Sequence, residues 1–278
     1  MRRYAILGYP LGHTLSPFIH TRLFALSGES GEYSRAEISP EALDAEMPNL
    51  KSLDGFNVTI PHKEAVIPWL DRLDPSAERY RAVNVVRCTD GACVGYNTDA
   101  FGFRRAIELL GTGLSGRVLL LGAGGAGRMM AMETVLCGGR LTVAVRNADA
   151  PRTRALLTFL RERVPEARVR ICGLDEIDGA FDLLCNSTPV GMYPKTDECP
   201  VTEAVVSRSG AVFDAVYNPV ETVLLRRARA LRIPARGGMD MLVWQAVRAH
   251  EIWYSGRFAQ SDVESLIEAC NGQLTDRA

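Results

Sequence analysis

Residues 117–127, RVLLLGAGGAG, decide the fold of this chain. The run RVLLL is apolar almost throughout, as in a strand of a parallel sheet that is covered on both faces. Gly122, Gly124 and Gly127 then form G-x-G-x-x-G, and residues 126–137 have the apolar spacing of a helix. The three glycines permit a tight turn, close approach of a pyrophosphate and close helix–strand packing, respectively. The stretch predicts a strand–turn–helix unit that binds a dinucleotide at the helix N-terminus, and the alternative is a glycine-rich turn with no ligand.

The sequence after this stretch alternates strands and helices, which is typical of a doubly wound sheet. Strands are predicted at residues 141–145, 168–172, 182–185 and 210–216, with helices at 153–163 and between the last two strands. We therefore expect an α/β protein with a Rossmann-type domain over residues 102–238.

The first part of the chain also mixes strands and helices. Strands are predicted at residues 4–7, 54–59, 83–87 and 93–96, and helices at 17–26, 61–70 and 99–110. Ser16 before Pro17 has the pattern of an N-cap, with proline in the first turn. After Gly238 the chain is predicted to be helical, over residues 239–254 and 262–270.

Composition excludes several classes of function. The chain has 278 residues, 47% of them hydrophobic and 23% charged, and a net charge of -1, so no basic field favours nucleic acid or a membrane surface. No segment approaches the ~20 apolar residues of a membrane span, and the run at residues 4–7 is too short for a signal peptide. The seven cysteines include no C-x-x-C pair; we interpret them, Cys88 and Cys93 included, as thiols in a reducing cytoplasm, without zinc or disulfides.

The end of the second Rossmann strand bears on the choice between NAD and NADP. NAD enzymes usually place an acid there, whereas this chain has Arg146 followed by Asn147. An arginine fits a 2′-phosphate because its planar fork can bind two oxygens at once. Arg152 and Arg154 could add to this clamp, and Asp149 lies too far into the next helix to reach the ribose. The pattern favours an arginine that binds the 2′-phosphate of NADP over an arginine that is simply solvated at the surface.

Several further stretches carry polar residues in a characteristic order. They are GYPLGHTLSP (8–17), GFNVTIPHK (55–63), AVN (82–84), GYNTD (95–99), NSTPVGM (186–192), DAVYNP (214–219) and GMDMLVWQA (238–246). In this order they resemble the shikimate dehydrogenase family from end to end. The resemblance implies a substrate-binding catalytic domain at residues 1–101, to which residues 239–278 return, an NADP domain at 102–238, and an active site in the cleft between them.

The resemblance implies that Lys63 and Asp99 are the catalytic pair. Hydride reduction of a ketone leaves an alkoxide that needs a proton, and an ammonium can donate it. An adjacent Asp99 would hold Lys63 charged and in place, which suits ketone reduction and works against Lys63 as a base in alcohol oxidation. The alternative is a purely structural ion pair.

The resemblance also assigns binding residues. The substrate contacts it implies are Thr14, Ser16, Thr59, Asn84, Tyr217 and Gln245, whose hydroxyls and amides can donate and accept. The cofactor contacts are Gly122, Ala123, Gly124, Gly125, Ala126, Gly127, Arg146, Asn147, Thr188, Ala215 and Gly238. We interpret His13 and His62 as supporting residues.

The implied activity is the NADP-dependent, reversible reduction of 3-dehydroshikimate to shikimate, a step of chorismate and aromatic amino acid biosynthesis. The expected protein is a cytoplasmic monomer or homodimer without metal. In this chain Thr14 replaces the first serine of the family's Ser-x-Ser, and its methyl narrows the pocket. Arg146 stands where the family has Asn-Arg-Thr, but its neighbours differ. A quinate or quinate/shikimate dehydrogenase using NAD(P) is the alternative enzyme, and a non-catalytic redox regulator is the alternative of another class.

Overall fold

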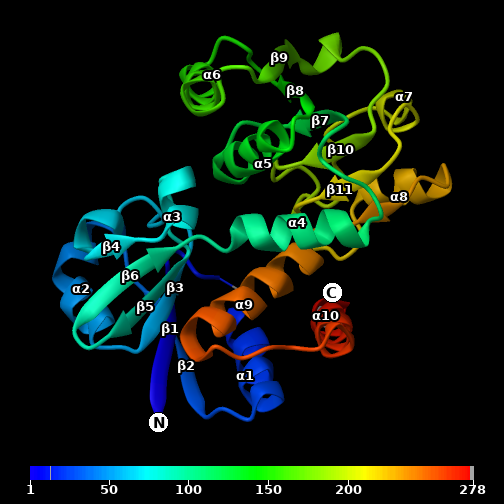
Figure 1. The fold of residues 1–278 in the computed structure, drawn as a ribbon. Coiled ribbons are helices and arrows are strands. Elements are labelled where there is room, and N and C mark those ends of the chain that lie inside the picture. The colour runs from blue at the N-terminus through cyan, green and yellow to red at the C-terminus, as the bar shows by residue number, and fades with distance from the viewer. Residues whose placement is uncertain (13, 276–278) are drawn as a thin grey trace. The chain divides into compact units, whose positions relative to one another are not determined.

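The computed structural model describes residues 1–12 and 14–275, which form two compact units (Figure 1). Unit 1 comprises residues 1–102 and 243–270, and unit 2 comprises residues 103–242 with the described residues from 271 on. Three helices contribute residues to both units, namely α4 (Asp99–Leu109), α9 (Gly238–Tyr254) and α10 (Gln260–Thr275). Among the described residues, no helix is both long and apolar enough to cross a membrane.

Unit 1 contains a mixed six-stranded sheet with the strand order β2-β1-β3-β5-β6-β4. Its strands are β1 (Arg2–Gly8), β2 (Gly31–Glu37), β3 (Gly55–Val58), β4 (Arg72–Leu73), β5 (Val85–Thr89) and β6 (Ala92–Tyr96). Strands β2, β1 and β3 run parallel, β5 is antiparallel to both β3 and β6, and β4 is parallel to β6. The carboxyl ends of β1 and β3 therefore lie side by side, with Leu7 opposite Val58.

Helices cover both faces of this sheet. Besides the three shared helices, the helical elements of unit 1 are α1 (Ser16–Ser27), η1 (Pro40–Ala42), α2 (Leu43–Lys51), η2 (Ile67–Trp69) and α3 (Pro75–Tyr80). On one face Leu7 and Phe56 pack in a core with Met47 of α2. On the other face Tyr4 packs with Trp253 of α9. Because successive strand residues point to opposite faces, β1 is buried on both sides.

Two local predictions for unit 1 are wrong. Ser16 is not an N-cap. The N-cap of α1 is Leu15, whose side chain makes no capping hydrogen bond, and the Ser16 hydroxyl contacts Thr14. The helix predicted at residues 61–70 consists of turns and the short η2. There the Lys63 carbonyl accepts from the Val83 N–H, which comes from outside the segment, and Pro68 has no N–H to donate.

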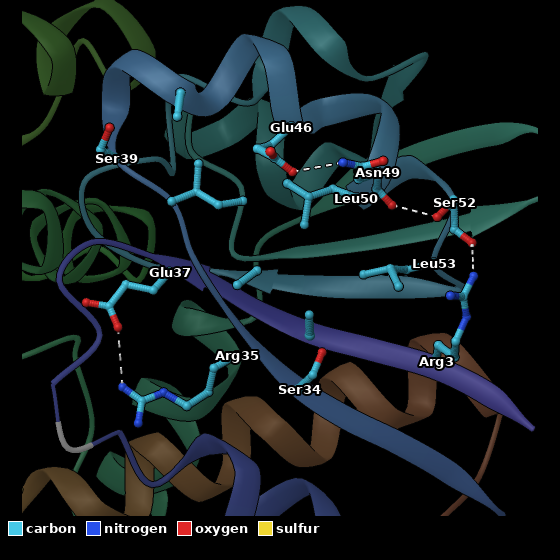
Figure 2. Close-up of a pocket in the computed structure, with 14 residues that line it drawn as sticks. Arg3, Ser34, Arg35, Glu37, Ser39, Glu46, Asn49, Leu50, Ser52 and Leu53 are labelled. Atoms are coloured by element: carbon cyan, nitrogen blue, oxygen red, sulfur yellow. Dashed lines mark hydrogen bonds and ion pairs between the residues drawn. The ribbon is translucent and has the colours of Figure 1, made fainter.

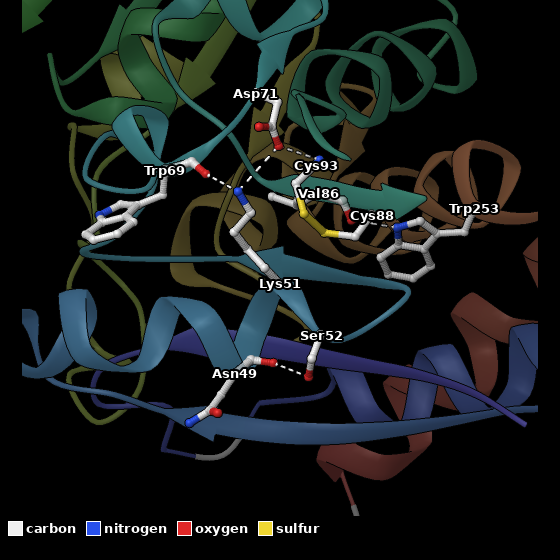
Figure 3. Close-up of a disulfide and its surroundings, with 9 residues drawn as sticks. All are labelled: Asn49, Lys51, Ser52, Trp69, Asp71, Val86, Cys88, Cys93 and Trp253. Carbon is white, nitrogen blue, oxygen red and sulfur yellow. Dashed lines mark hydrogen bonds and ion pairs between the residues drawn. A yellow bond between two sulfur atoms is a disulfide. The ribbon is translucent and has the colours of Figure 1, made fainter. Parts of the chain in front are cut away.

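The thiol interpretation is wrong for Cys88 and Cys93, which form a disulfide between β5 and β6 (Figure 3). The two residues face each other across the hairpin. The Cys88 N–H donates to the Asp54 carbonyl, and the Cys93 N–H donates to Asp71 Oδ2. Because neither bond joins β5 to β6, Cys88 and Cys93 form a non-hydrogen-bonded pair of the hairpin. Such pairs bring side chains closest together, and the Cα atoms here are 4.1 Å apart. The other cysteines, Cys137, Cys172, Cys185, Cys199 and Cys270, are free; Cys137 is exposed, and the rest are buried or half-buried.

Unit 2 contains a parallel six-stranded sheet with the order β12-β11-β10-β7-β8-β9. Its elements are β7 (Arg117–Leu121), α5 (Gly125–Leu136), β8 (Arg140–Val145), α6 (Pro151–Arg163), β9 (Arg168–Gly173), η3 (Leu174–Glu176), β10 (Leu183–Asn186), α7 (Glu203–Val206), β11 (Val212–Asp214), α8 (Val223–Ala230) and β12 (Ala235–Arg236). This is the 3-2-1-4-5-6 order of a Rossmann fold, read from β9 to β12. The topological switch point lies between β7 and β10, where such sheets bind ligands.

The α/β fold class predicted from the sequence is confirmed. Strand β7 spans the predicted run of residues 117–121, and Leu119 and Leu121 are fully buried in the core. Strands β2, β4 and β12 and helices α2, α3 and α8 were not predicted.

Candidate active site

Lys63 and Asp99 form a close ion pair in unit 1. Lys63 lies in the turn after β3, and Asp99 is the first residue of α4. Lys63 Nζ lies 2.5 Å from Asp99 Oδ2, with the lysine side chain 28% and the carboxylate 13% exposed. The predicted pair is thus brought together, and it remains open enough for a small molecule to reach the ammonium.

Asn84 holds the other oxygen of this carboxylate. Its Nδ2 donates to Asp99 Oδ1 at 2.8 Å, and also contacts Thr98 Oγ1 at 3.0 Å and Gln245 Oε1 at 3.2 Å. Its Oδ1 accepts from the Thr98 N–H at 2.7 Å. Asn84 is 2% exposed, so these bonds are shielded from water. Each oxygen of Asp99 therefore has its own donor, which fixes the orientation of the carboxylate toward Lys63.

The predicted hydroxyl residues lie after the carboxyl ends of β1 and β3. Thr14 donates from its hydroxyl to Ser16 Oγ at 3.2 Å, and the Ser16 N–H donates to Thr14 Oγ1 at 3.2 Å. Thr59 follows β3, and its N–H bonds the Leu7 carbonyl. A Cβ at Gly8 would lie 2.4 Å from Thr59 Cγ2 and 2.5 Å from Leu11 Cδ2, so a larger residue there would displace these two side chains.

The glycine-rich turn in unit 2 has the geometry that a dinucleotide requires. Gly122 has φ +97°, and Cβ atoms at Gly122 and Gly127 would lie 2.8 Å from Thr188 Cγ2 and 2.7 Å from the Gly122 carbonyl oxygen. A Cβ at Gly124 would instead meet nothing within 4 Å. Two glycines thus serve turn and packing, and Gly124, the N-cap of α5, faces open space at the helix N-terminus.

The neighbouring loops of unit 2 are tied to this turn at the switch point. Ser187 follows β10 and donates from its hydroxyl to the Leu121 carbonyl at 2.7 Å. Asn186 donates to Asp214 Oδ1 at 2.9 Å, which joins the loops after β10 and β11. Burial raises the pKa of the Asp214 carboxyl, although Thr222, Val216 and Asn186 all donate to it. The loop carrying Thr188 and the loop carrying Ala215 are therefore fixed at the carboxyl edge of the sheet.

Arg146 lies directly beyond β8 and is exposed. Within the described part of the chain, its guanidinium has no hydrogen-bond or ion-pair partner. Asn147 accepts from the Asp149 N–H at 3.0 Å, which turns the backbone from β8 toward α6. A free guanidinium at the end of the second strand is available to a phosphate.

Comparisons with known proteins agree with this geometry. A family model described as "Shikimate dehydrogenase substrate binding domain" matches residues 6–86. The shikimate dehydrogenase (NADP(+)) of Caldanaerobacter subterraneus is 36% identical over 276 residues, which cover 98% of this chain and 97% of that protein. The enzyme of the same name from Methanothermobacter thermautotrophicus is 40% identical over 265 residues, covering 93% and 92% of the two chains. This chain belongs to the shikimate dehydrogenase family.

A solved structure of the shikimate dehydrogenase family extends the likeness to three dimensions. The shikimate 5-dehydrogenase of Thermus thermophilus, in complex with NADP(H) and shikimate, superposes with a TM-score of 0.85 at 33% identity. The match covers 97% of this chain and 99% of that one. The likeness therefore includes both units and not only the segment matched by the family model.

The other described residues named from the sequence lie after β3, after β11 and at the start of α9. Tyr217 follows β11, and burial raises the pKa of its phenol, so the hydroxyl keeps its proton at neutral pH. Gly238 begins α9, and a Cβ there would lie 2.1 Å from the Ala215 carbonyl oxygen. His62 is buried, and its Nε2 donates to the Ile38 carbonyl at 2.7 Å, which fits a supporting role. His13 lies outside the described residues.

A groove beside α2 is separate from these residues. It has a volume of about 660 Å³ and lies over Ala5, Ser34 and Ala36 of β1 and β2 (Figure 2). The described residues that line it include no predicted substrate-binding residue. Its charged groups already have partners, such as Arg35 with Glu37 at 3.6 Å.

Sequence reasoning missed residues that organise the site. Thr98, Asn186 and Asp214 belong to the quoted polar stretches, but their roles depend on contacts between strands that no spacing rule reveals. Tyr33 had no sequence signal, because β2 mixes exposed and half-buried residues without a buried apolar face.

Proposed function

We propose that this protein catalyses the NADPH-dependent reduction of 3-dehydroshikimate to shikimate and the reverse reaction, a step of aromatic amino acid biosynthesis. The observation that carries the proposal is the Lys63–Asp99 pair at 2.5 Å, with Asn84 and Gln245 beside it. Two further observations support the proposal. Relatives of this chain are named shikimate dehydrogenase (NADP(+)), and the glycine-rich turn of the Rossmann sheet has open space at Gly124.

Lys63 is proposed as the proton donor and Asp99 as the group that holds it. Bound NADPH supplies a hydride to the ketone carbon. As the ketone oxygen gains charge, the Lys63 ammonium donates a proton to it and leaves a neutral amine. Asp99 stabilises the ammonium before transfer and keeps Nζ in one place. In the reverse direction Lys63 begins as the neutral amine and accepts the proton from the substrate hydroxyl.

The substrate is proposed to contact Thr14, Ser16, Thr59, Asn84, Tyr217 and Gln245. Thr14 and Ser16 present adjacent hydroxyls, which suit a carboxylate because it can only accept hydrogen bonds. Gln245 is half-buried and presents an amide next to the ion pair, which suits ring hydroxyls that both donate and accept. Asn84 is 2% exposed and its amide already contacts Asp99, Thr98 and Gln245, so its proposed substrate contact would replace one of these bonds.

Residues 122–127 are proposed to hold the pyrophosphate, with Arg146 and Asn147 at the 2′-phosphate and Thr188, Ala215 and Gly238 lining the rest of the cofactor site. Open space at Gly124 and the unpaired guanidinium of Arg146 support this assignment. On this basis residues 1–101 with 239–278 form the substrate domain and residues 102–238 the cofactor domain.

Initial rates decide between this function and its alternatives. Purified protein should oxidise NADPH with 3-dehydroshikimate and reduce NADP with shikimate, and be slower with quinate and with NAD. Faster turnover of quinate would favour the quinate dehydrogenase. Binding of NADPH without turnover of either acid would favour a non-catalytic regulator.

A further inference from the structure

The side chain of Asn97 joins the start of α4 to the segment that leads into β5. Asn97 directly follows β6 and lies two residues before Asp99. Its Oδ1 accepts from the Asp99 N–H at 3.0 Å, and its Nδ2 donates to the Ala82 carbonyl at 2.9 Å. Its own backbone N–H donates to Ser76 Oγ of α3 at 3.1 Å. One amide therefore ties the backbone of Asp99 to the backbone of Ala82.

The segment that begins at Ala82 reaches both members of the proposed catalytic pair. The Val83 N–H donates to the Lys63 carbonyl at 2.8 Å. The next residue, Asn84, donates from its side chain to Asp99 Oδ1, also at 2.8 Å. A shift at Ala82 would therefore move the Lys63 turn and the start of α4 relative to each other.

Both bonds of the Asn97 side chain are needed to make this tie. An asparagine whose oxygen accepts from the N–H two residues on is a common local turn. The donor bond to Ala82 is not part of that turn and comes from a distant part of the chain. The Asp99 N–H can only donate and the Ala82 carbonyl can only accept, so the amide has one orientation. Asn97 is 6% exposed, and this burial shields its bonds from water.

We propose that Asn97 is a positioning residue, which holds the Asp99 carboxylate where it stabilises the Lys63 ammonium. This inference rests on the proposed function, in which Lys63 is the proton donor. Lys63 Nζ lies 2.5 Å from Asp99 Oδ2, and the attraction between opposite charges weakens as they separate. If the backbone of Asp99 moved, the carboxylate would stabilise the ammonium less, and Lys63 would lose its proton at a lower pH.

Asn97→Ala removes both side-chain bonds, and NMR titration of isotope-labelled lysine reports the result directly. The sequence contains three lysines, Lys51, Lys63 and Lys195, so each Cε signal can be assigned from a lysine-to-arginine variant. In Asn97→Ala the pH midpoint of the Lys63 titration should fall by roughly 1 pH unit, the lower end of what a neighbouring opposite charge supplies. The Lys195 midpoint should not move. An unchanged Lys63 midpoint in the folded variant would overturn the proposal.

Asp71→Ala is the matched control, because Asp71 also holds a backbone N–H of unit 1. Asp71 Oδ2 accepts from the Cys93 N–H at 2.8 Å, near the start of β6, whereas Asn97 follows its end (Figure 3). Any change among the lysine titrations should be confined to Lys51, which pairs with Asp71. A fall of the Lys63 midpoint equal to that in Asn97→Ala would show that general loss of stability is the cause, and would contradict the proposal.

A double-mutant cycle shows whether the effect passes through the Asp99 carboxylate. In an Asp99→Asn background, Asn97→Ala should not lower the Lys63 midpoint further, because the negative charge is already gone. Equal falls in the two backgrounds would mean that Asn97 acts on Lys63 by another route, which the proposal excludes.

Kinetics connect the position of Asp99 to the proposed reaction. In Asn97→Ala the kcat for reduction of 3-dehydroshikimate should fall roughly tenfold, less than the ~10²-fold that a misplacement of ~1 Å can cost, because Asn84 still holds the carboxylate. The KM for NADPH should not change, because the bonds of Asn97 lie within unit 1. An unchanged kcat would overturn the claim that this placement serves proton donation.

Asn97→Ser keeps the proposal testable if Asn97→Ala does not fold. A serine hydroxyl can still accept from the Asp99 N–H, but it is too short to reach Ala82 as well. The Lys63 midpoint should therefore fall in the same direction but less far, and a parental midpoint together with a lowered Tm would overturn the proposal. The titration needs no substrate. Failure of the parent to reduce 3-dehydroshikimate would contradict the proposed function, while the Lys63 midpoint would still decide whether Asn97 places Asp99.

Discussion

Lys63 Nζ lies 2.5 Å from Asp99 Oδ2, and the other oxygen of the same carboxylate accepts from Asn84. Because Asn84 also holds the Thr98 N–H, the start of α4 is fixed by the same amide that orients Asp99. The ammonium is thus held by a carboxylate that cannot rotate freely. A proton donor with this support needs little rearrangement during reaction.

Lys63→Ala should lower kcat by about 10²–10⁴-fold, the usual contribution of a general acid, and leave the affinity for NADP nearly unchanged. Steady-state rates and cofactor titration measure the two effects. Lys51→Ala is the control, because Lys51 is also paired with an aspartate of unit 1, Asp71, at 3.4 Å (Figure 3). Similar kcat values for Lys63→Ala and Lys51→Ala would contradict the assigned role.

Gly124→Ala and Gly127→Ala should fail in different ways. A Cβ at Gly124 meets only open space, so the fold should keep its Tm while the KM for NADPH and NADH rises about tenfold or more from a misfit at the pyrophosphate. A Cβ at Gly127 would lie 2.7 Å from the Gly122 carbonyl oxygen, so that variant should lose roughly 1–3 kcal/mol of stability. Thermal melts and cofactor kinetics separate them. A fall in Tm for Gly124→Ala equal to that of Gly127→Ala would contradict the assignment of open space.

The sequence predicted the buried parts of the fold well because burial leaves a pattern. Strand β7 lies in the core of a parallel sheet and reads as a continuous apolar run. The edge strand β2 pairs only with β1 and carries Glu32, Arg35 and Glu37 on its exposed positions, so no alternation of buried residues marks it. Tyr33 was missed with its strand.

Tertiary hydrogen bonds explain the other differences between sequence and structure. Residues 61–70 have helical spacing, but the Lys63 carbonyl bonds Val83 instead of continuing a helix. The Cys88–Cys93 disulfide depends on the register of the β5–β6 hairpin, which cysteine spacing alone does not reveal. By contrast, Lys63, Asp99, Asn84 and Gln245 were all named from the family resemblance, and the structure brings them together.

Arg146→Ala should raise the KM for NADPH and barely change that for NADH. A charge-assisted contact contributes about 1.5–3 kcal/mol, or roughly one to two decades in affinity. Arg140→Ala is the control, since Arg140 is exposed at the opposite end of the same strand, β8. Equal losses with NADPH and NADH would indicate that Arg146 supports packing and does not read the 2′-phosphate.

The stability of the protein should fall as the pH drops below about 6.5, the ordinary histidine value. His250 is fully buried without a partner for either ring nitrogen among the described residues, and burial lowers its pKa to about 3. Between pH 6.5, the ordinary histidine pKa, and pH 3, the unfolded chain therefore binds a proton at His250 that the folded chain does not bind. The contribution of His250 to stability is complete above about pH 6.5 and is lost progressively as the pH falls toward about 3. At pH 5 the loss from this group is on the order of 2 kcal/mol.

His250→Phe should weaken this pH dependence, because it keeps an aromatic ring beside Phe24 and Tyr254 and removes the titrating group. Urea denaturation at pH 7 and pH 5 measures it. His20, whose pKa burial also lowers well below the ordinary value, should supply the slope that remains. Equal losses between the two pH values in parent and variant would contradict the assignment to His250.

Thr14 should set the choice between shikimate and quinate. Its hydroxyl donates to Ser16, and its methyl takes volume beside the proposed carboxylate site. Quinate is bulkier there, because the carbon bearing its carboxylate is tetrahedral and carries a hydroxyl, so the methyl should disfavour it by about 1–3 kcal/mol. Thr14→Ser should keep shikimate turnover and improve quinate turnover, and Thr14→Val should damage both by deleting the hydroxyl. The specificity constants of the three proteins with both acids, at saturating NADP, measure this. If Thr14→Ser lowers quinate turnover, or if the parent already prefers quinate, then Thr14 is a contact adapted to quinate and not a source of crowding.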